Sequence, residues 1–166
     1  MQRALSVVEA PHPILRKKTQ KIESFNDTFR AFLDQMMTVM KESKGAGLAA
    51  PQVGESLHVF TMLISESKPY KMCNLEILSK SDETISYTEG CLSFPGVFLE
   101  IERPKSVHVR YWDEFGQMIE EEFTEWEARC IQHELDHLEG KLFIDQLSSD
   151  RKDFIIRKIQ KGKAEI

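Results

Sequence analysis

The chain has 166 residues and a mass of 19.2 kDa, which is enough for one well-buried core and short for two domains. Hydrophobic residues make up 41% of it and charged residues 30%, as in an ordinary globular protein, and no apolar run approaches the length of a membrane span. The net charge of −5 argues against nucleic acid as the main ligand and against specific DNA binding.

The start of the chain and its cysteines indicate the cellular setting. MQRALSVVEAPHP lacks the basic start and long apolar core of a secretory signal, and no transit peptide is evident. Three cysteines (Cys73, Cys91 and Cys130) cannot all pair within one chain. We therefore expect a cytoplasmic protein, in which a cysteine is more often buried, metal-binding or catalytic than disulfide-bonded.

The first predicted element is a helix that runs from an N-cap at Asn26 to about residue 44 and stops at Gly45. Its apolar stripe predicts core packing rather than a cofactor pocket; the stripe comprises Phe29, Phe32, Leu33, Met36, Met37 and Met40. From Leu57 to Phe123 the pattern changes to short β-rich runs, which are LHVFTMLI, YKMCNLEIL, VFLEIE, SVHVRYW and QMIEEEF. Residues 113–116, DEFG, predict a hairpin turn between the last two runs.

A second helix follows the strands. Thr124 and Glu127 have the spacing of a capping box, and the helix is expected to pass through His137 and end near Gly140. A helix, a set of antiparallel strands and another helix predict an α+β fold.

The last 16 residues differ from the rest in charge. Residues 151–166 contain six Lys or Arg and two Asp or Glu, a net charge of +4. Since the whole chain carries −5, the preceding 150 residues carry −9. A basic tail on an acidic body indicates a docking segment for an anionic partner. The alternative is a solvated amphipathic helix, packed through Phe154, Ile155 and Ile159.

The stretch CIQHELDHLEG, residues 130–140, places His133 and His137 four positions apart on the second helix. At that spacing both imidazoles project from one face and can bind the same ion, while Glu134 can reach water beside it. The alternative is a surface helix with two solvated histidines. It is weakened by the apolar side of the helix, which implies close packing and comprises Ile131, Leu135 and Leu138.

A catalytic zinc-type site needs a third protein ligand and an open position. The third histidine of one group of metalloproteases would fall at Phe143. Cys130 lies about 10 Å along the helix axis from His137, at ~1.5 Å per residue, so it is better interpreted as a buried residue beside the site. Cys73 lies in an apolar strand-like run. Cys91, in EGCLSFPG, is the better candidate for the third ligand.

GAGLAAPQVG, residues 45–54, has little side-chain bulk, as expected where a substrate backbone lies close by. Gln52 adds an amide donor that could polarise a carbonyl. A tight helix-to-strand turn would also explain the composition.

Together, GAGLAAPQ (45–52), EGCLS (89–93) and QHELDH (132–137) resemble the three signature motifs of the peptide deformylase family, in the same order. The opening VVEAPHPILRKKTQKI is also similar, so the resemblance covers essentially the whole chain. It implies antiparallel sheets packed around a central HExxH-bearing helix, with N-terminal and C-terminal helices. It implies one catalytic domain over residues 1–150 and a basic C-terminal helix over residues 151–166.

The implied activity is removal of the formyl group from the formyl-methionine at the start of newly made bacterial or organellar proteins. The resemblance implies Cys91, His133 and His137 as ligands of one divalent metal ion, with Glu134 as the catalytic acid/base. It implies that Gln52 and the Leu92 backbone N–H stabilise the oxyanion and that Glu89 and Gln132 support the site. Residues expected to line or contact the substrate site are Ala46, Gly47, Glu89, Phe98, Trp126 and Cys130.

The resemblance implies Fe(II) as the native metal, with Zn(II), Ni(II) or Co(II) as other occupants, since a Cys/His/His set accepts all four. It implies docking to the ribosome through the C-terminal helix, and the lack of a long apolar run predicts no membrane partner. Three positions depart from the family pattern. Leu75 replaces a common proline and is expected to alter the start of a strand, whereas Phe98 and Trp126 are expected to affect side-chain preference.

Two other classes of function stay open. A general metallopeptidase would use the same HExxH pattern, and activity on acetylated or free peptides would distinguish it. A non-catalytic metal or interaction module would need a closed site with four protein ligands. The sequence offers no good fourth ligand.

Overall fold

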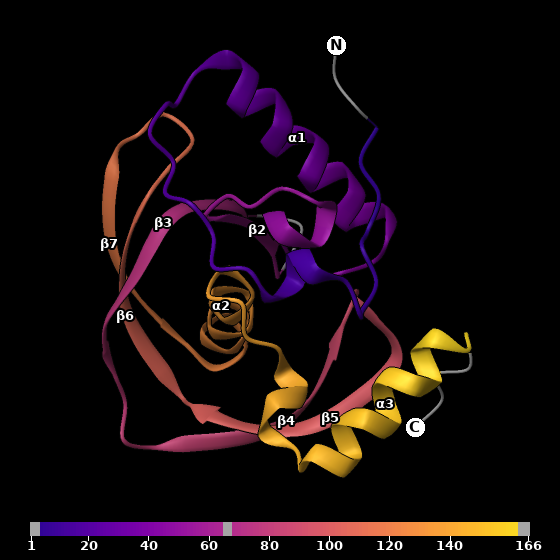
Figure 1. Cartoon of the computed structure of the whole chain (residues 1–166). Helices are drawn as coiled ribbons and strands as arrows, with labels where there is room; N and C mark the ends of the chain where they lie inside the picture. Colours follow the sequence, from indigo (N-terminus) through magenta and orange to yellow (C-terminus); the bar gives the residue numbers. More distant parts are fainter. Residues whose placement is uncertain (1–3, 65–67, 163–166) are drawn as a thin grey trace.

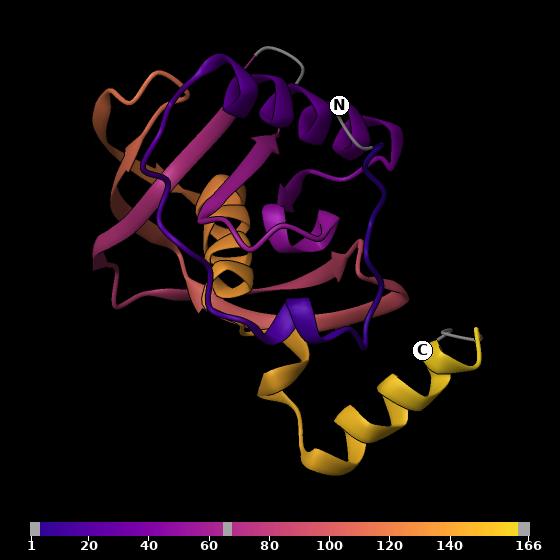
Figure 2. The ribbon, with the colours of Figure 1, turned by 45° about the horizontal axis from the view of Figure 1, so that its top comes forward.

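A central helix surrounded by strands organises the molecule. The computed structural model describes residues 4–64 and 68–162. Figure 1 shows α2 (Glu125–Leu138) in the middle, with strands curving around it and α1 (Asp27–Glu42) across one side. Figure 2 shows α3 (Ser149–Gln160) on the outside of the body, on the side away from α1. The expected α+β fold with antiparallel sheets is confirmed.

Two antiparallel sheets form the walls. The larger has the strand order β1-β2-β3-β6-β7, with β1 (Gly47–Ala49), β2 (Val59–Leu63), β3 (Pro69–Lys80), β6 (Ser106–Trp112) and β7 (Met118–Thr124). The smaller pairs β4 (Thr84–Cys91) with β5 (Phe94–Pro104). Short 3-10 turns cover Pro13–Arg16 (η1), Ala50–Val53 (η2) and Phe143–Gln146 (η3). The predicted hairpin turn is confirmed, since Gly116 (φ 82°) donates its N–H to Asp113 O between β6 and β7.

Two expectations about strands were wrong or incomplete. Sequence reasoning missed β4, because most of its residues are exposed and it lacks an apolar face of regular period. Leu75 does not lie at the start of a strand: β3 begins at Pro69, and Leu75 sits at a register shift between Cys73 and Glu76. A shift of this kind accommodates an irregular backbone inside the strand, here with Asn74 at φ 54°.

The predicted first helix is confirmed. Asn26 Oδ1 accepts a hydrogen bond from the Phe29 backbone N–H at 2.9 Å, as an N-cap should. Its buried stripe packs in one core cluster with β1, η2 and β2, so the expectation of core packing is also confirmed. The expected stop at Gly45 was wrong, because the residue in the left-handed region is Lys44 (φ 59°).

The second helix begins and ends where predicted, but not with the predicted cap. Thr124 is the N-cap and its side chain makes no capping hydrogen bond, so the capping box with Glu127 was wrong. Instead, the backbone N–H of Glu125, a residue at φ 57°, donates to Lys105 O at 2.9 Å. The start of α2 is therefore tied to the β5–β6 connection by backbone.

The C-terminal helix α3 packs through part of its apolar face. Ile155 and Ile159 are buried in a cluster with residues of β5, whereas Phe154 is 50% exposed and has Lys158 Nζ 5.3 Å from its ring centroid. Of the three residues named in the alternative of a packed helix, Ile155 and Ile159 therefore pack as described and Phe154 does not. Residues 163–166 of the predicted basic segment lie outside the described ranges. Among the described helices, none has the length and apolar character needed to cross a bilayer.

We predict that Gly140→Ala destabilises the fold by more than about 2 kcal/mol in urea unfolding, because two costs combine at this site. Gly140 has φ 75°, where an L-residue costs about 1–2 kcal/mol. A Cβ would also lie 2.5 Å from Arg16 O, which is backbone and cannot move aside cheaply. Gly162→Ala is the control, since its φ is 68° and nothing lies within 4 Å of the added Cβ. If both variants lost the same free energy of unfolding, a clash with Arg16 O would not be the cause.

Candidate active site

One face of α2 presents the two histidines of the HELDH stretch. The ring centroids of His133 and His137 lie 5.2 Å apart, one helical turn from each other. The opposite side of the helix packs into the main core through Ile131 and Leu138, with Leu135 against its edge. The interpretation of a closely packed helix with two converging imidazoles is therefore consistent with the structure.

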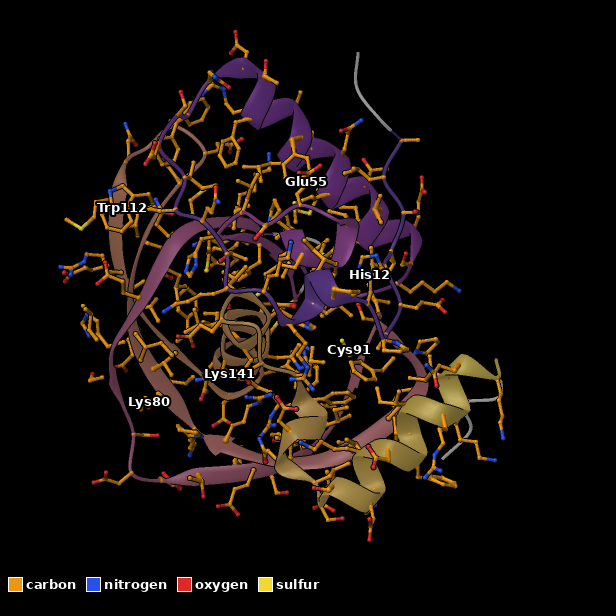
Figure 3. The ribbon with its side chains drawn as sticks, in the orientation of Figure 1. His12, Glu55, Lys80, Cys91, Trp112 and Lys141 are labelled. Atoms are coloured by element: carbon orange, nitrogen blue, oxygen red, sulfur yellow. The ribbon has the colours of Figure 1, made fainter. Side chains whose placement is uncertain are left out.

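Cys91 meets these histidines from the end of β4. Its Sγ lies 3.2 Å from His137 Nε2, and the donor atoms of Cys91, His133 and His137 all lie within 4.8 Å of one another. The register of β4 on β5 shifts between Gly90 and Cys91, and such a bulge re-aims a side chain. Figure 3 labels Cys91 on the part of β4 that faces α2.

This donor set fits a divalent metal ion. One sulfur and two nitrogens converge closely enough for a single ion to contact all three, and such a set suits zinc-like metals with an open coordination position. Burial lowers the pKa of His137 well below its ordinary value. The ring is thus neutral, which is the form that binds a metal.

The other two cysteines lie away from this convergence. Cys73 is fully buried in the cluster around α1, and burial raises the pKa of its thiol to about 12. Cys130 is also buried, and burial raises the pKa of its thiol well above the ordinary value. Both remain protonated packing residues at neutral pH.

Glu134 lies beside the histidines in an almost dry position. It is 2% exposed, and its Oε1 has no hydrogen-bond partner in the described structure. Burial raises its pKa to about 7, against the opposing effect of His133. A carboxyl group that changes protonation near neutral pH can both accept and return a proton.

A buried carboxylate, Glu89, holds His133 from behind. Its Oε1 lies 2.9 Å from His133 Nδ1, and Arg103 bonds the same carboxylate through Nε (2.6 Å) and Nη2 (3.0 Å). Arg129 Nη1 bonds it as well. Burial alone would raise the pKa of Glu89, but the hydrogen bonds from His133 and Arg103 lower it to about 2. The carboxylate is therefore ionised and fixes the His133 ring so that Nε2 is free to bind.

Sequence reasoning missed Arg103 and Arg129 entirely. Both are buried, with exposed fractions of 5% and 2%. The one available signal was Arg129 itself, a charged residue between two small apolar residues, Ala128 and Cys130, on the helix that carries the histidines.

A cavity of about 450 Å³ opens in front of this cluster. Every residue expected to line or contact the substrate site borders it, namely Ala46, Gly47, Glu89, Phe98, Trp126 and Cys130. Gln52, Leu92, Cys91, His133 and Glu134 border it too, whereas His137 is 1% exposed and lies deeper. Phe98 is 61% exposed and Trp126 42% exposed, so both lie at its rim.

Packing inside the protein, as well as the expected approach of a substrate backbone, explains why the residues of GAGLAAPQ are small. A Cβ on Gly47 would lie 2.7 Å from Glu134 Oε2 and 2.9 Å from Cys130 Sγ. Close approach here is therefore by α2, which needs a residue without a side chain at this position of β1.

Gln52 and Gln132 are held by hydrogen bonds at two sides of the site. Gln52 is 1% exposed; its Oε1 accepts from Ala49 N at 3.0 Å, and its Nε2 lies 3.1 Å from Ser93 Oγ and 3.6 Å from Cys91 Sγ. Gln132 Nε2 donates to Pro104 O at 3.0 Å, which ties α2 to β5.

Comparison with known proteins agrees with this architecture. The model of the polypeptide deformylase family matches residues 4–153. A peptide deformylase of Rickettsia akari is 41% identical over 171 residues, covering 98% of each chain. One from Pseudothermotoga lettingae is 46% identical over 146 residues, covering 88% of this chain and 84% of its own.

Solved structures give the same result. The crystal structure of peptide deformylase from Ehrlichia chaffeensis in complex with actinonin has a TM-score of 0.93 and 35% identity, covering 98% of this chain and 99% of that one. The chain therefore belongs to the peptide deformylase family of hydrolases.

Proposed function

We propose that this enzyme removes the N-formyl group from the formyl-methionine at the start of newly made proteins and releases formate. The observation that carries the proposal is the convergence of Cys91, His133 and His137 donor atoms within 4.8 Å, beside a buried glutamate and an open cavity. Membership of the deformylase family supports the choice of a formyl amide over other amides. Because newly made bacterial proteins emerge from ribosomes in the cytoplasm, we propose that the enzyme acts there.

We propose that these three residues hold one divalent ion, natively Fe(II), with Zn(II), Ni(II) or Co(II) as possible occupants of the purified protein. When bound, such an ion supplies Lewis acidity, which lowers the pKa of water and polarises a carbonyl.

The remaining chemistry belongs to the side chains around the cavity. Glu134 takes a proton from the attacking water and returns it to the amine that leaves when the formyl C–N bond breaks. Gln52 Nε2 and the Leu92 backbone N–H donate to the oxygen that becomes negative during attack. The support for these roles is position: all three residues border the same cavity as Cys91 and His133.

The peptide would bind as an added strand. β1 is an edge strand of the larger sheet, and Gly45, Ala46 and Gly47 border the cavity. An extended peptide can therefore pair with this edge. Its methionine side chain would enter the cavity near Cys130, and later residues would cross the rim at Phe98 and Trp126.

We propose that residues 1–150 form the catalytic domain and that the basic helix of residues 151–166 docks on the ribosome. The described part of α3 supports this arrangement. It buries Ile155 and Ile159 against the body and leaves Arg151 and Arg157 exposed.

Cys91→Ala is expected to abolish metal binding, because two imidazoles alone make a weak site. Cys73→Ala and Cys130→Ala are matched controls that remove a thiol without removing a proposed ligand, and both should keep the metal. Metal content after dialysis is the measurement. If the Cys91→Ala variant kept the metal content of the wild type, the third ligand would be a residue other than Cys91.

Glu134→Gln is expected to keep the metal and lose the reaction. Glutamine is nearly isosteric, but it cannot carry the proton, so kcat on formyl-Met peptides should fall by at least about 10²–10⁴-fold with little change in KM. Acetyl-Met and free Met peptides are control substrates that the wild type should not hydrolyse. Activity within a few-fold of wild type would assign the base to another residue. Loss of metal in step with activity would give Glu134 a supporting role.

Neutralising Arg151, Arg157 and Lys161 to Gln is expected to weaken co-sedimentation with ribosomes, most visibly at low salt, because exposed charges are screened as salt rises. Turnover of short formyl-Met peptides should be unchanged. Substitution is cleaner than deletion of 151–166, since deletion also removes two buried isoleucines. The control changes three exposed lysines elsewhere, at 18, 41 and 80. Equal binding by both triple variants would reject docking through α3.

A further inference from the structure

We propose that Arg129 is a positioning residue for the metal centre: it fixes the strand that carries Cys91 against the helix that carries His133 and His137. The inference rests on the proposed metal binding and adds a residue that the sequence motifs do not include. It is drawn from three contacts of one buried guanidinium.

Arg129 projects from α2 into the junction with the smaller sheet. Its Nη2 donates to Ile85 O at 2.5 Å, and its Nη1 donates to Ile101 O at 2.9 Å and to the Glu89 carboxylate. Ile85 belongs to β4 and Ile101 to β5, so one side chain binds the backbone of both strands. The guanidinium also lies 5.2 Å from the ring centroid of Tyr87 on β4.

The junction matters because the proposed ligands come from its two sides. His133 and His137 are one turn apart on α2, so the helix alone fixes their spacing. Cys91 lies at the end of β4, whose residues are mostly exposed, so its distance from the histidines depends on how β4 is held. Arg129 supplies two of the polar contacts that hold β4, to Ile85 O and to Glu89, and a third, to Ile101 O, links it to β5.

The contact with Glu89 extends the same effect to His133. Glu89 Oε1 lies 2.9 Å from His133 Nδ1, while the Arg129 bond is to the other oxygen, Oε2. Arg103 already bonds both oxygens, and Arg129 adds a further hydrogen bond that restrains the plane of the carboxylate and, through it, the direction of the imidazole. Groups bonded directly to a metal ligand, as Glu89 is to His133, typically change metal affinity by about 10–100-fold when they are removed, and Arg129 acts through Glu89.

Charge neutralisation does not explain Arg129. Arg103 already makes a forked pair with Glu89, and its Nη1 has a further partner in Asp136 at 3.0 Å. A second buried guanidinium is costly, and the Nε of Arg129 has no hydrogen-bond partner in the described structure. Arg129 adds the hydrogen bonds to the Ile85 and Ile101 carbonyls, which hold β4 and β5 in position against α2.

The test measures Co(II) binding to the metal-free full-length chain. Chelator competition gives the dissociation constant, and the charge-transfer absorption of a thiolate–Co(II) bond reports whether Cys91 is a ligand. We expect Arg129→Met to bind Co(II) about 10–100-fold more weakly, with a reduced or shifted thiolate band. Arg129→Lys should recover part of the affinity at most, because an ammonium group cannot span a carboxylate and two carbonyls as a planar fork does.

Arg30→Met is the matched control. Arg30 also bonds two carbonyls, Phe25 O at 2.5 Å and Glu114 O at 3.4 Å, pairs with Asp27 and lies over an aromatic ring, but its contacts are around α1. The Arg30→Met variant should have a lower free energy of unfolding in urea and an unchanged dissociation constant for Co(II). Should Arg129→Met fail to fold, Arg129→Lys and Arg129→Gln carry the comparison.

The outcomes separate this inference from the function on which it rests. If the wild type itself shows no thiolate–Co(II) band, the proposed metal centre is wrong and the inference falls with it. If the wild type shows the band and Arg129→Met keeps both band and affinity, only the inference is overturned. Lower stability at unchanged affinity would also overturn it, because that is the behaviour of a purely structural arginine.

Discussion

The buried carboxylate of Glu89 is the interaction on which the site depends. It is 3% exposed and receives hydrogen bonds from Arg103, Arg129 and His133. A carboxylate at this depth would be strongly destabilising without such partners, because removing one member of a buried ion pair typically costs about 3–5 kcal/mol. The donors come from β5 and α2, so satisfying one charge also determines how the helix meets the smaller sheet. Fold and site are therefore set by the same contacts.

The two elements that carry the proposed ligands are held in different ways. α2 is enclosed by the larger sheet and packs on it through apolar residues, so its histidines are positioned by the main core. The β4–β5 pair packs its inner residues in a separate cluster with η3 and α3. Since Ile155 and Ile159 of α3 belong to that cluster, the C-terminal helix supports the strand pair that bears Cys91. Its buried face supports the sheet, whereas Arg151 and Arg157 on its outer side stay exposed.

Residue patterns predicted much of this, and the failures have physical causes. The α1 stripe, the hairpin turn and the HELDH helix depend on local periodicity or turn chemistry, which sequence carries directly. β4 was not predicted because most of its residues are exposed, so apolar residues do not recur at every second position along it. The capping box failed because the Thr124 side chain makes no capping hydrogen bond; the start of the helix is held by a backbone bond from the Glu125 N–H to Lys105 O. Arg129 could not be assigned because its partners, Ile85, Glu89 and Ile101, lie 28 to 44 residues away along the chain. Local pattern says nothing about such pairing.

Gly47 lies between the strand edge proposed to bind the substrate and the glutamate proposed to transfer the proton. β1 offers the edge along which an extended peptide could pair, and α2 carries Glu134. The two elements approach so closely at Gly47 that a methyl group would lie 2.7 Å from Glu134 Oε2. A peptide aligned by the β1 backbone is therefore also aligned with the carboxylate, because no side chain separates them. The absence of a side chain at Gly47 is thus a requirement of internal packing first, and the access it gives a substrate follows from that packing.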